Sequence, residues 1–203
     1  MLFTAVCAYV GAALYPRLSP KESTAAMAER VSACVRLEGI ALREELSLSL
    51  PDDPALFARD GERLSGDRVL AATTGTEDSG SGSALFLAFS DGLEQLSPAD
   101  ALPLSVDRVR SLMAAVPGQQ EGDGRLVLGF DWYYAALSDY SGALPQGRCS
   151  LRFDGFDGAV TGRLVEVSGY ENGERALLFR LMTGDTDYLK LRNCRAELIL
   201  PGG

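Results

Sequence analysis

The chain has 203 residues and a formal net charge of −9, with 46% hydrophobic and 23% charged residues. This apolar content can fill a core, so we expect one large or two small folded domains. The acidic balance argues against a nucleic-acid ligand, because neutralising phosphates requires clustered Lys and Arg, and it also disfavours an anionic membrane surface. The sequence contains no His, which removes the commonest general base and the commonest transition-metal ligand.

The N-terminal residues 1–15 (MLFTAVCAYVGAALY) are apolar and uncharged. This run is shorter than the roughly 20 residues of a membrane-spanning helix. A signal peptide carries its basic residues before the apolar run, whereas Arg17 and Lys21 follow it. We interpret residues 1–15 as a membrane anchor whose start is clipped, with a buried N-terminal helix as the alternative. Residues 16–29 are predicted to be a polar tether.

Residues 31–50 have the pattern of β-strands. Gly39 interrupts the apolar positions and predicts a bulge or a close approach between strands. Leucines then alternate with serines, which is typical of a half-buried strand. The apolar residues concerned are Val35, Leu37, Ile40, Leu42, Leu46, Leu48 and Leu50.

Residues 60–71 (DGERLSGDRVLA) are predicted to form short strand ends joined by turns, because Asp-Gly and Ser-Gly-Asp tolerate positive φ. Residues 73–83 are rich in Gly, Ser and Thr and predict a flexible surface connection. Residues 84–90 form a second apolar strand, and Asp91-Gly92 repeats the Asp-Gly turn. A weak internal repeat therefore relates residues 60–71 to residues 83–96.

The next segment has helical signals. Ser97-Pro98 predicts a helical turn, and Ser105 is placed to cap a second helix. Pro117-Gly118 ends that helix, and residues 118–124 are the best candidate for a domain boundary. One apolar helix face is predicted to contain Val106, Val109, Leu112, Met113 and Val116.

From residue 124 onwards the apolar period is two, which predicts strands. The pair Leu164-Val165 indicates a bulge, and Asn172-Gly173 is a strong hairpin signal. Short strands with turns at regular spacing indicate a small antiparallel barrel or sandwich. One long strand is predicted to place Leu126, Leu128, Phe130, Trp132, Tyr134 and Ala136 on one face, and the next strand Cys149, Leu151 and Phe153.

The four cysteines Cys7, Cys34, Cys149 and Cys194 are far apart and form no C-x-x-C pair, so no zinc or redox motif is present. Cys149 and Cys194 lie among apolar strand residues. We favour buried small hydrophobic side chains for these two, with a disulfide across strands as the alternative.

Several segments resemble HlyD-type membrane-fusion proteins, the periplasmic adaptor subunits of efflux and secretion systems. DGERLSGDRVLA (60–71) and SALFLAFSDGLEQL (83–96) are similar to the two lipoyl-like half-motifs of that family. FDWYYAALSD (130–139), GRCSLRF (147–153) and RNCRAELIL (192–200) resemble its barrel. The similarity is strongest to a poorly characterised branch found in Gram-positive anaerobes.

The resemblance implies a mainly β fold after the apolar N-terminal helix. Its parts would be a lipoyl-like barrel-sandwich hybrid over residues 30–96, a short helical connector over residues 97–123, and an antiparallel β-barrel over residues 124–203. Family members usually carry a long coiled-coil hairpin between the half-motifs, but here only residues 72–83 occupy that position, without a heptad pattern.

Lipoyl and biotinyl domains are modified on a lysine at a hairpin tip. No lysine lies between Lys21 and Lys190, so neither half-motif can carry such an arm. The lipoyl resemblance is therefore architectural, and we expect no cofactor and no metal.

The resemblance implies a non-enzymatic, membrane-anchored adaptor with an extracytoplasmic body. Its expected partners are a membrane protein complex, either a transporter permease or envelope proteins, and an assembly of several copies of this chain is left open. Exposed side chains such as Tyr133 and Arg152 could contribute contacts, although we prefer an ordinary solvated face for both. The alternative function is a structural cell-envelope protein with the same fold and no transport role.

An enzyme is the third hypothesis. Asp91, Glu94 and Asp131 lie near predicted turns, and paired carboxylates can perform acid–base hydrolysis. Nothing in the sequence sets their spacing, and acidic residues at turns usually serve the turn itself. We therefore assign no catalytic, cofactor-binding or metal-binding residue.

Overall fold

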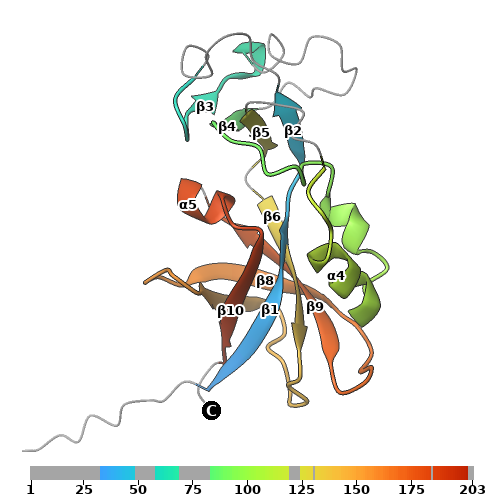
Figure 1. The fold of residues 1–203 in the computed structure, drawn as a ribbon. Coiled ribbons are helices and arrows are strands. Elements are labelled where there is room, and N and C mark those ends of the chain that lie inside the picture. Colours follow the sequence, from blue (N-terminus) through green and yellow to red (C-terminus); the bar gives the residue numbers. More distant parts are fainter. Residues whose placement is uncertain are drawn as a thin grey trace, which may run out of the picture. The chain divides into compact units, whose positions relative to one another are not determined.

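The computed structural model describes residues 33–48, 58–68, 83–118, 124–129, 131–183 and 185–200. These residues form a mainly β fold with a closed antiparallel barrel and a four-stranded sheet, which confirms the predicted mainly β character and the presence of an antiparallel barrel (Figure 1). The predicted N-terminal helix over residues 1–15 and the tether over residues 16–29 lie outside the described residues. Within the described ranges, no helix has the length and apolar character needed to cross a membrane.

The barrel has the strand order β1-β10-β7-β8-β9-β6, and β6 closes it by pairing with β1. Every pairing in it is antiparallel. Its strands are β1 (Cys34–Leu42), β6 (Asp131–Ser138), β7 (Arg148–Phe153), β8 (Val160–Val167), β9 (Arg175–Met182) and β10 (Asn193–Ile199).

The second sheet has the order β2-β5-β4-β3 and is also antiparallel. Its strands come from the sequence between β1 and β6, and they are β2 (Glu45–Leu48), β3 (Arg63–Leu64), β4 (Ala84–Leu87) and β5 (Gly124–Leu128). Strand membership thus differs from the predicted division of the chain. The strand at 34–42, grouped with residues 30–96, belongs to the barrel, and the strand at 124–128, grouped with the barrel, belongs to the four-stranded sheet.

The prediction of one long strand over residues 126–136 is wrong. The structure has two strands there, β5 and β6, and β5 ends before Gly129, whose φ of 74° lies in the left-handed region that favours glycine. The chain changes direction there and passes from one sheet to the other. An uninterrupted period-two pattern does not reveal such a break, because both strands keep the same alternation on either side of it.

The two Asp-Gly segments do pair with each other. Strand β3 lies antiparallel to β4, the Gly61 nitrogen donates to the Phe86 oxygen at 2.9 Å, and the Phe86 nitrogen donates to the Glu62 oxygen at 2.9 Å. Gly61 has a φ of 79°, as the predicted turn requires. Residues 69–71 lie outside the described residues, and the lipoyl-like hybrid stays a prediction.

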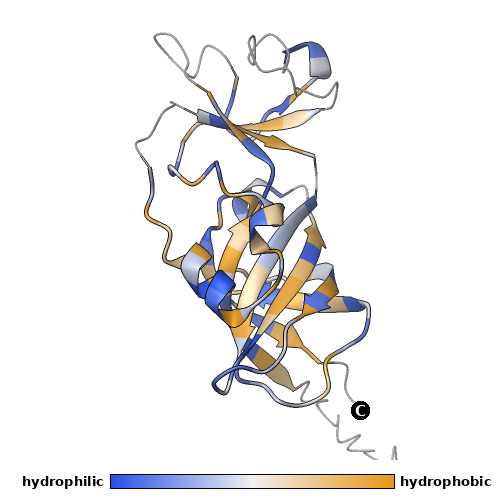
Figure 2. Ribbon diagram, turned by 90° about the vertical axis from the view of Figure 1, so that its right-hand side faces the viewer, coloured by the Kyte–Doolittle hydropathy of each residue, from blue (hydrophilic) through white to orange (hydrophobic). Residues whose placement is uncertain are grey.

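The main core fills the barrel. Buried and exposed residues alternate along its strands, and Figure 2 shows this alternation of hydrophobic and hydrophilic residues. Trp132 is fully buried, and its ring centroid lies 5.5 Å from that of Phe153. Leu85, Leu87 and Val127 of the four-stranded sheet belong to the same core cluster, so one face of this sheet packs on the barrel core.

Helices cover part of the outer barrel surface. The 3-10 helix η1 (Pro98–Ala101) has a capping box between Ser97 and Asp100. The helix α4 (Val106–Met113) is capped by Ser105, whose hydroxyl accepts from the Arg108 nitrogen at 3.2 Å. These helices confirm the predicted helical turn and cap. Buried residues of both helices pack on outward-facing residues of β1, β6 and β9 (Figure 1).

Val116 was predicted to belong to the apolar face of the helix, and this prediction is wrong. Val116 lies beyond the C-cap Ala114 and is 82% exposed, because the helix ends before its period reaches that position.

Three backbone predictions are confirmed. A Cβ on Gly39 would lie 2.2 Å from the Ala135 oxygen, so β1 and β6 approach closely there. The register between β8 and β9 shifts between Leu164 and Glu166, as a bulge requires. Asn172 has a φ of 52° and forms the tip of the β8–β9 hairpin with Gly173.

Candidate functional site

Two charged sites stand out among the described residues. The first, which we call the buried ion cluster, gathers charges from the end of β1, from β2 and β5, from the loop after β4, and from the residue before β10. Its members are Arg43, Glu45, Asp91, Glu94, Arg125 and Arg192. Three positive and three negative groups balance one another, which buried charges require.

Glu45 is the shared acceptor of the cluster. Its carboxylate lies 3.4 Å from Arg43 and 3.5 Å from Arg125, and it accepts a hydrogen bond from Arg192. The Glu45 side chain has no exposed surface. One carboxylate therefore connects the first barrel strand, the four-stranded sheet and the start of β10.

Arg43 reaches the end of the barrel core. Its guanidinium lies 5.4 Å from the centre of the Trp132 ring, and it donates to the backbone oxygens of Tyr188 at 3.1 Å and Leu191 at 2.6 Å. Burial lowers the pKa of Arg43 to about 10, although the charge of Glu45 acts in the opposite direction. The side chain is thus a buried cation at neutral pH, and Glu45 is its counter-ion.

The structure brings together two of the three carboxylates that the sequence suggested. Asp91 and Glu94 both lie near Nη1 of Arg125, at 2.5 Å and 3.8 Å. Glu94 also accepts from the Ser90 hydroxyl and from the Asp91 nitrogen, each at 2.8 Å. Asp131 lies on β6 instead, where it pairs with Arg180.

The ion pairs shift the protonation of Asp91. Burial alone would raise its pKa, but the hydrogen bonds and charges of Arg192 and Arg125 outweigh burial and lower the pKa to about 2. A carboxyl group that acts as a general acid at neutral pH requires a raised pKa, whereas the pKa of Asp91 is lowered. Its geometry indicates a structural ion pair.

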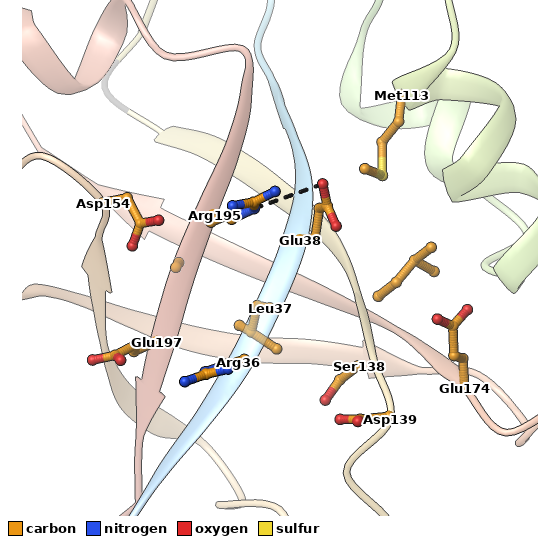
Figure 3. A pocket seen from close by; sticks show the side chains of 12 residues that line it. Arg36, Leu37, Glu38, Met113, Ser138, Asp139, Asp154, Glu174, Arg195 and Glu197 are labelled. Carbon is orange, nitrogen blue, oxygen red and sulfur yellow. Dashed lines mark ion pairs between the residues drawn. The ribbon is translucent and has the colours of Figure 1, made fainter.

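The second site, which we call the acidic groove, is a hollow of about 590 Å³ lined by the outer residues of β1 and β10, the end of α4 and the ends of β6, β7 and β9. Figure 3 shows Met113 pointing from α4 towards the groove and Glu38 of β1 paired with Arg195 of β10 at 3.9 Å. Its charged lining residues are Arg36, Glu38, Asp139, Asp154, Glu174, Arg195 and Glu197.

Carboxylates outnumber arginines in this lining by five to two. Glu174 and Glu197 pair with arginines outside the lining, Arg110 at 2.5 Å and Arg152 at 3.1 Å. Asp139 and Asp154 form no ion pair with any described residue. The groove therefore offers a negatively charged surface with one thioether at its edge. This groove was not predicted from the sequence. The one pattern that points to it is the alternation of charged and apolar residues in β1 and β10, which places the charged side chains on the outer face of the barrel.

The remaining singled-out residues have ordinary environments. Tyr133 is half-buried against the helices, and Arg152 is exposed and paired with Glu197. Cys149 and Cys194 are free thiols rather than a disulfide. Burial raises the pKa of both, that of Cys194 to about 12, which makes them poor nucleophiles. Among the described residues, Cys, Asp and Glu side chains form no group of three or more that could hold a metal ion.

Comparison of the chain with protein-family models, with curated proteins and with solved structures finds no match.

Proposed function

We propose that this chain is a non-enzymatic, membrane-anchored extracytoplasmic adaptor of an efflux- or secretion-type assembly. It acts as a β scaffold that contacts partner proteins. The observation that carries the proposal is the buried ion cluster, which holds the four-stranded sheet on the end of the barrel through charges that have no exposed side-chain surface at Arg43, Glu45 and Arg125. Burying these charges costs desolvation energy. In return, the ion pairs fix the orientation of the four-stranded sheet on the barrel. A scaffold that must present two β modules in one orientation needs that property.

The acidic groove is the contact surface that we assign to the scaffold. An excess of carboxylates favours a partner segment with Lys or Arg, because opposite potentials across an interface steer association and set the register. Met113 at the edge can adapt to an apolar side chain of the same segment. Asp139 and Asp154 have no counter-ion among the described residues, so a basic partner would supply one.

A structural cell-envelope protein with the same fold is the second candidate. The observation that favours it is the short connection over residues 72–83, which has no room for a coiled-coil hairpin that docks at its tip. The two candidates differ in the identity of the partner, and not in the surface that binds it.

The test places a photo-crosslinking amino acid at Met113 of the full chain, in cells that carry the native gene. The matched control places it at Val116, which is 82% exposed and does not line the groove. A transporter permease crosslinked from Met113 and not from Val116 supports the adaptor. Cell-wall or division proteins in place of a permease favour the envelope role. The same products from both positions would contradict the groove as the contact surface.

A further inference from the structure

Three arginines lie directly opposite one another on neighbouring barrel strands. Arg148 of β7 is the register partner of Arg163 of β8, and Arg163 is the register partner of Arg180 of β9. All three are exposed, so they lie on the outer face of the barrel. We call them the arginine row. Strands are about 4.8 Å apart, so the row spans about 10 Å.

The row contrasts with the rest of the barrel surface. On β1, β10 and β7 the charged register partners have opposite charges: Arg36 with Glu197, Glu38 with Arg195, and Glu197 with Arg152. Like charges directly opposite each other destabilise a sheet, whereas opposite charges stabilise it. A barrel that pairs charges correctly on one side and places three arginines together on the other side has a local cost in stability there.

Few carboxylates compensate the row. Arg180 pairs with Asp131, with Nε of Arg180 3.0 Å from Oδ2. Arg148 and Arg163 form no ion pair with any residue that the structure describes. The three arginines, Asp131 and Thr161 line one hollow of about 480 Å³. This hollow has a net charge of +2 in a chain whose formal net charge is −9.

We propose that the arginine row binds a small anion with two neighbouring phosphate groups or one doubly charged phosphate. Guanidinium groups bind phosphate oxygens through paired, charge-assisted hydrogen bonds, and Thr161 adds a hydroxyl donor at the same hollow. A phosphate monoester carries a charge of about −1.5 to −2 at neutral pH, which matches the unpaired charge of the row, whereas a single carboxylate would leave one arginine uncompensated. This site lies outside the acidic groove and does not depend on the adaptor function.

The test is isothermal titration calorimetry of the full chain in a mild detergent with sodium pyrophosphate at low ionic strength. The central variant is Arg163→Glu, which removes the middle of the row. The matched control is Arg152→Glu, which changes an exposed arginine on β7 about 13 Å from Arg148. Circular dichroism and the thermal midpoint verify that both variants fold. Sodium acetate at equal ionic strength measures the response to a monoanion.

We expect saturable pyrophosphate binding that weakens at least about tenfold in Arg163→Glu and by less than about twofold in Arg152→Glu, since the row contacts are direct and the distant charge is screened. Acetate should not bind saturably. The proposal is overturned if the wild-type chain does not bind pyrophosphate, or if both variants weaken it equally. Arg163-dependent binding of an acidic peptide without pyrophosphate binding would also overturn it, in favour of a protein partner.

Discussion

Glu45 and Arg125 form an ion pair in which neither side chain is exposed, with Oε2 of Glu45 3.5 Å from Nη1 of Arg125. The two residues lie on the neighbouring strands β2 and β5, and the same carboxylate also serves Arg43 and Arg192. The junction between barrel and sheet therefore depends on one acidic side chain that is the shared ion-pair partner of three arginines, while Asp91 and Glu94 supply the other negative charges of the cluster. Removing either sign from such a cluster leaves the other without compensation.

Glu45→Ala should lower the free energy of unfolding by about 3–5 kcal/mol, because it leaves buried arginine charges without their shared acceptor. Urea denaturation of the full chain measures this change. The control is Glu44→Ala, since Glu44 is the exposed neighbour in the chain and forms no ion pair with a described residue. Equal stability of the two variants would contradict the role assigned to Glu45.

Asp91 should make stability depend on pH in the acid range. Its folded pKa of about 2 is below the ordinary 3.8, so its ion pairs stabilise the fold fully above pH 4 and are lost as the pH falls towards 2. This difference corresponds to about 2 kcal/mol at neutral pH. Asp91→Asn should remove that stabilisation at pH 7 and converge with the wild-type chain near pH 2.

Denaturation curves between pH 7 and pH 2 measure the effect. Asp157→Asn is the control, because Asp157 is exposed and has no ion pair within the described ranges. A constant difference between Asp91→Asn and the wild-type chain over this range would show that the carboxylate charge of Asp91 does not contribute.

Gly39→Ala should destabilise the barrel by about 1–3 kcal/mol or more, since the added Cβ would meet the Ala135 oxygen at 2.2 Å and the Ala136 Cα at 2.7 Å. The colliding atoms include backbone, so β1 and β6 must separate. Gly169→Ala is the matched control, because a Cβ there meets no atom within 4 Å. The control should be neutral or slightly stabilising, and equal losses in both variants would refute the close approach.

Arg163→Glu should raise the thermal midpoint by about 2 °C, because it converts two like-charge cross-strand pairs into attractive ones. Arg152→Glu should lower the midpoint, since it replaces the ion pair between Arg152 and Glu197 by two carboxylates that lie opposite each other. Differential scanning calorimetry without phosphate gives both values. If Arg163→Glu lowers the midpoint, the arginine row is not a source of strain in the free protein.

Much of the local structure followed from the sequence. The turns at Gly61 and Asn172, the cap at Ser105 and the bulge after Leu164 are confirmed, because each depends on the backbone freedom or hydrogen bonding of a few neighbouring residues. The break at Gly129 was missed because a glycine in a strand pattern does not specify whether the chain bends or changes sheets. The lipoyl-like hybrid and the adaptor function stay predictions.

The charged sites could not be predicted. Glu45, Asp91 and Arg192 are separated by tens to more than a hundred positions, and no local pattern relates them. The acidic groove and the arginine row likewise depend on register between strands that are distant in sequence.

By itself, the sequence determined a mainly β chain, the positions of most strands and turns, and the lack of histidine and of clustered cysteines. Those properties depend on residue type and short-range spacing. Tertiary structure alone decided which strands share a sheet, that Glu45 would pair with three arginines, and that Arg148, Arg163 and Arg180 would lie side by side. Strand pairing is a long-range choice made by packing and barrel closure, so the charges that it brings together can be seen only in the folded chain.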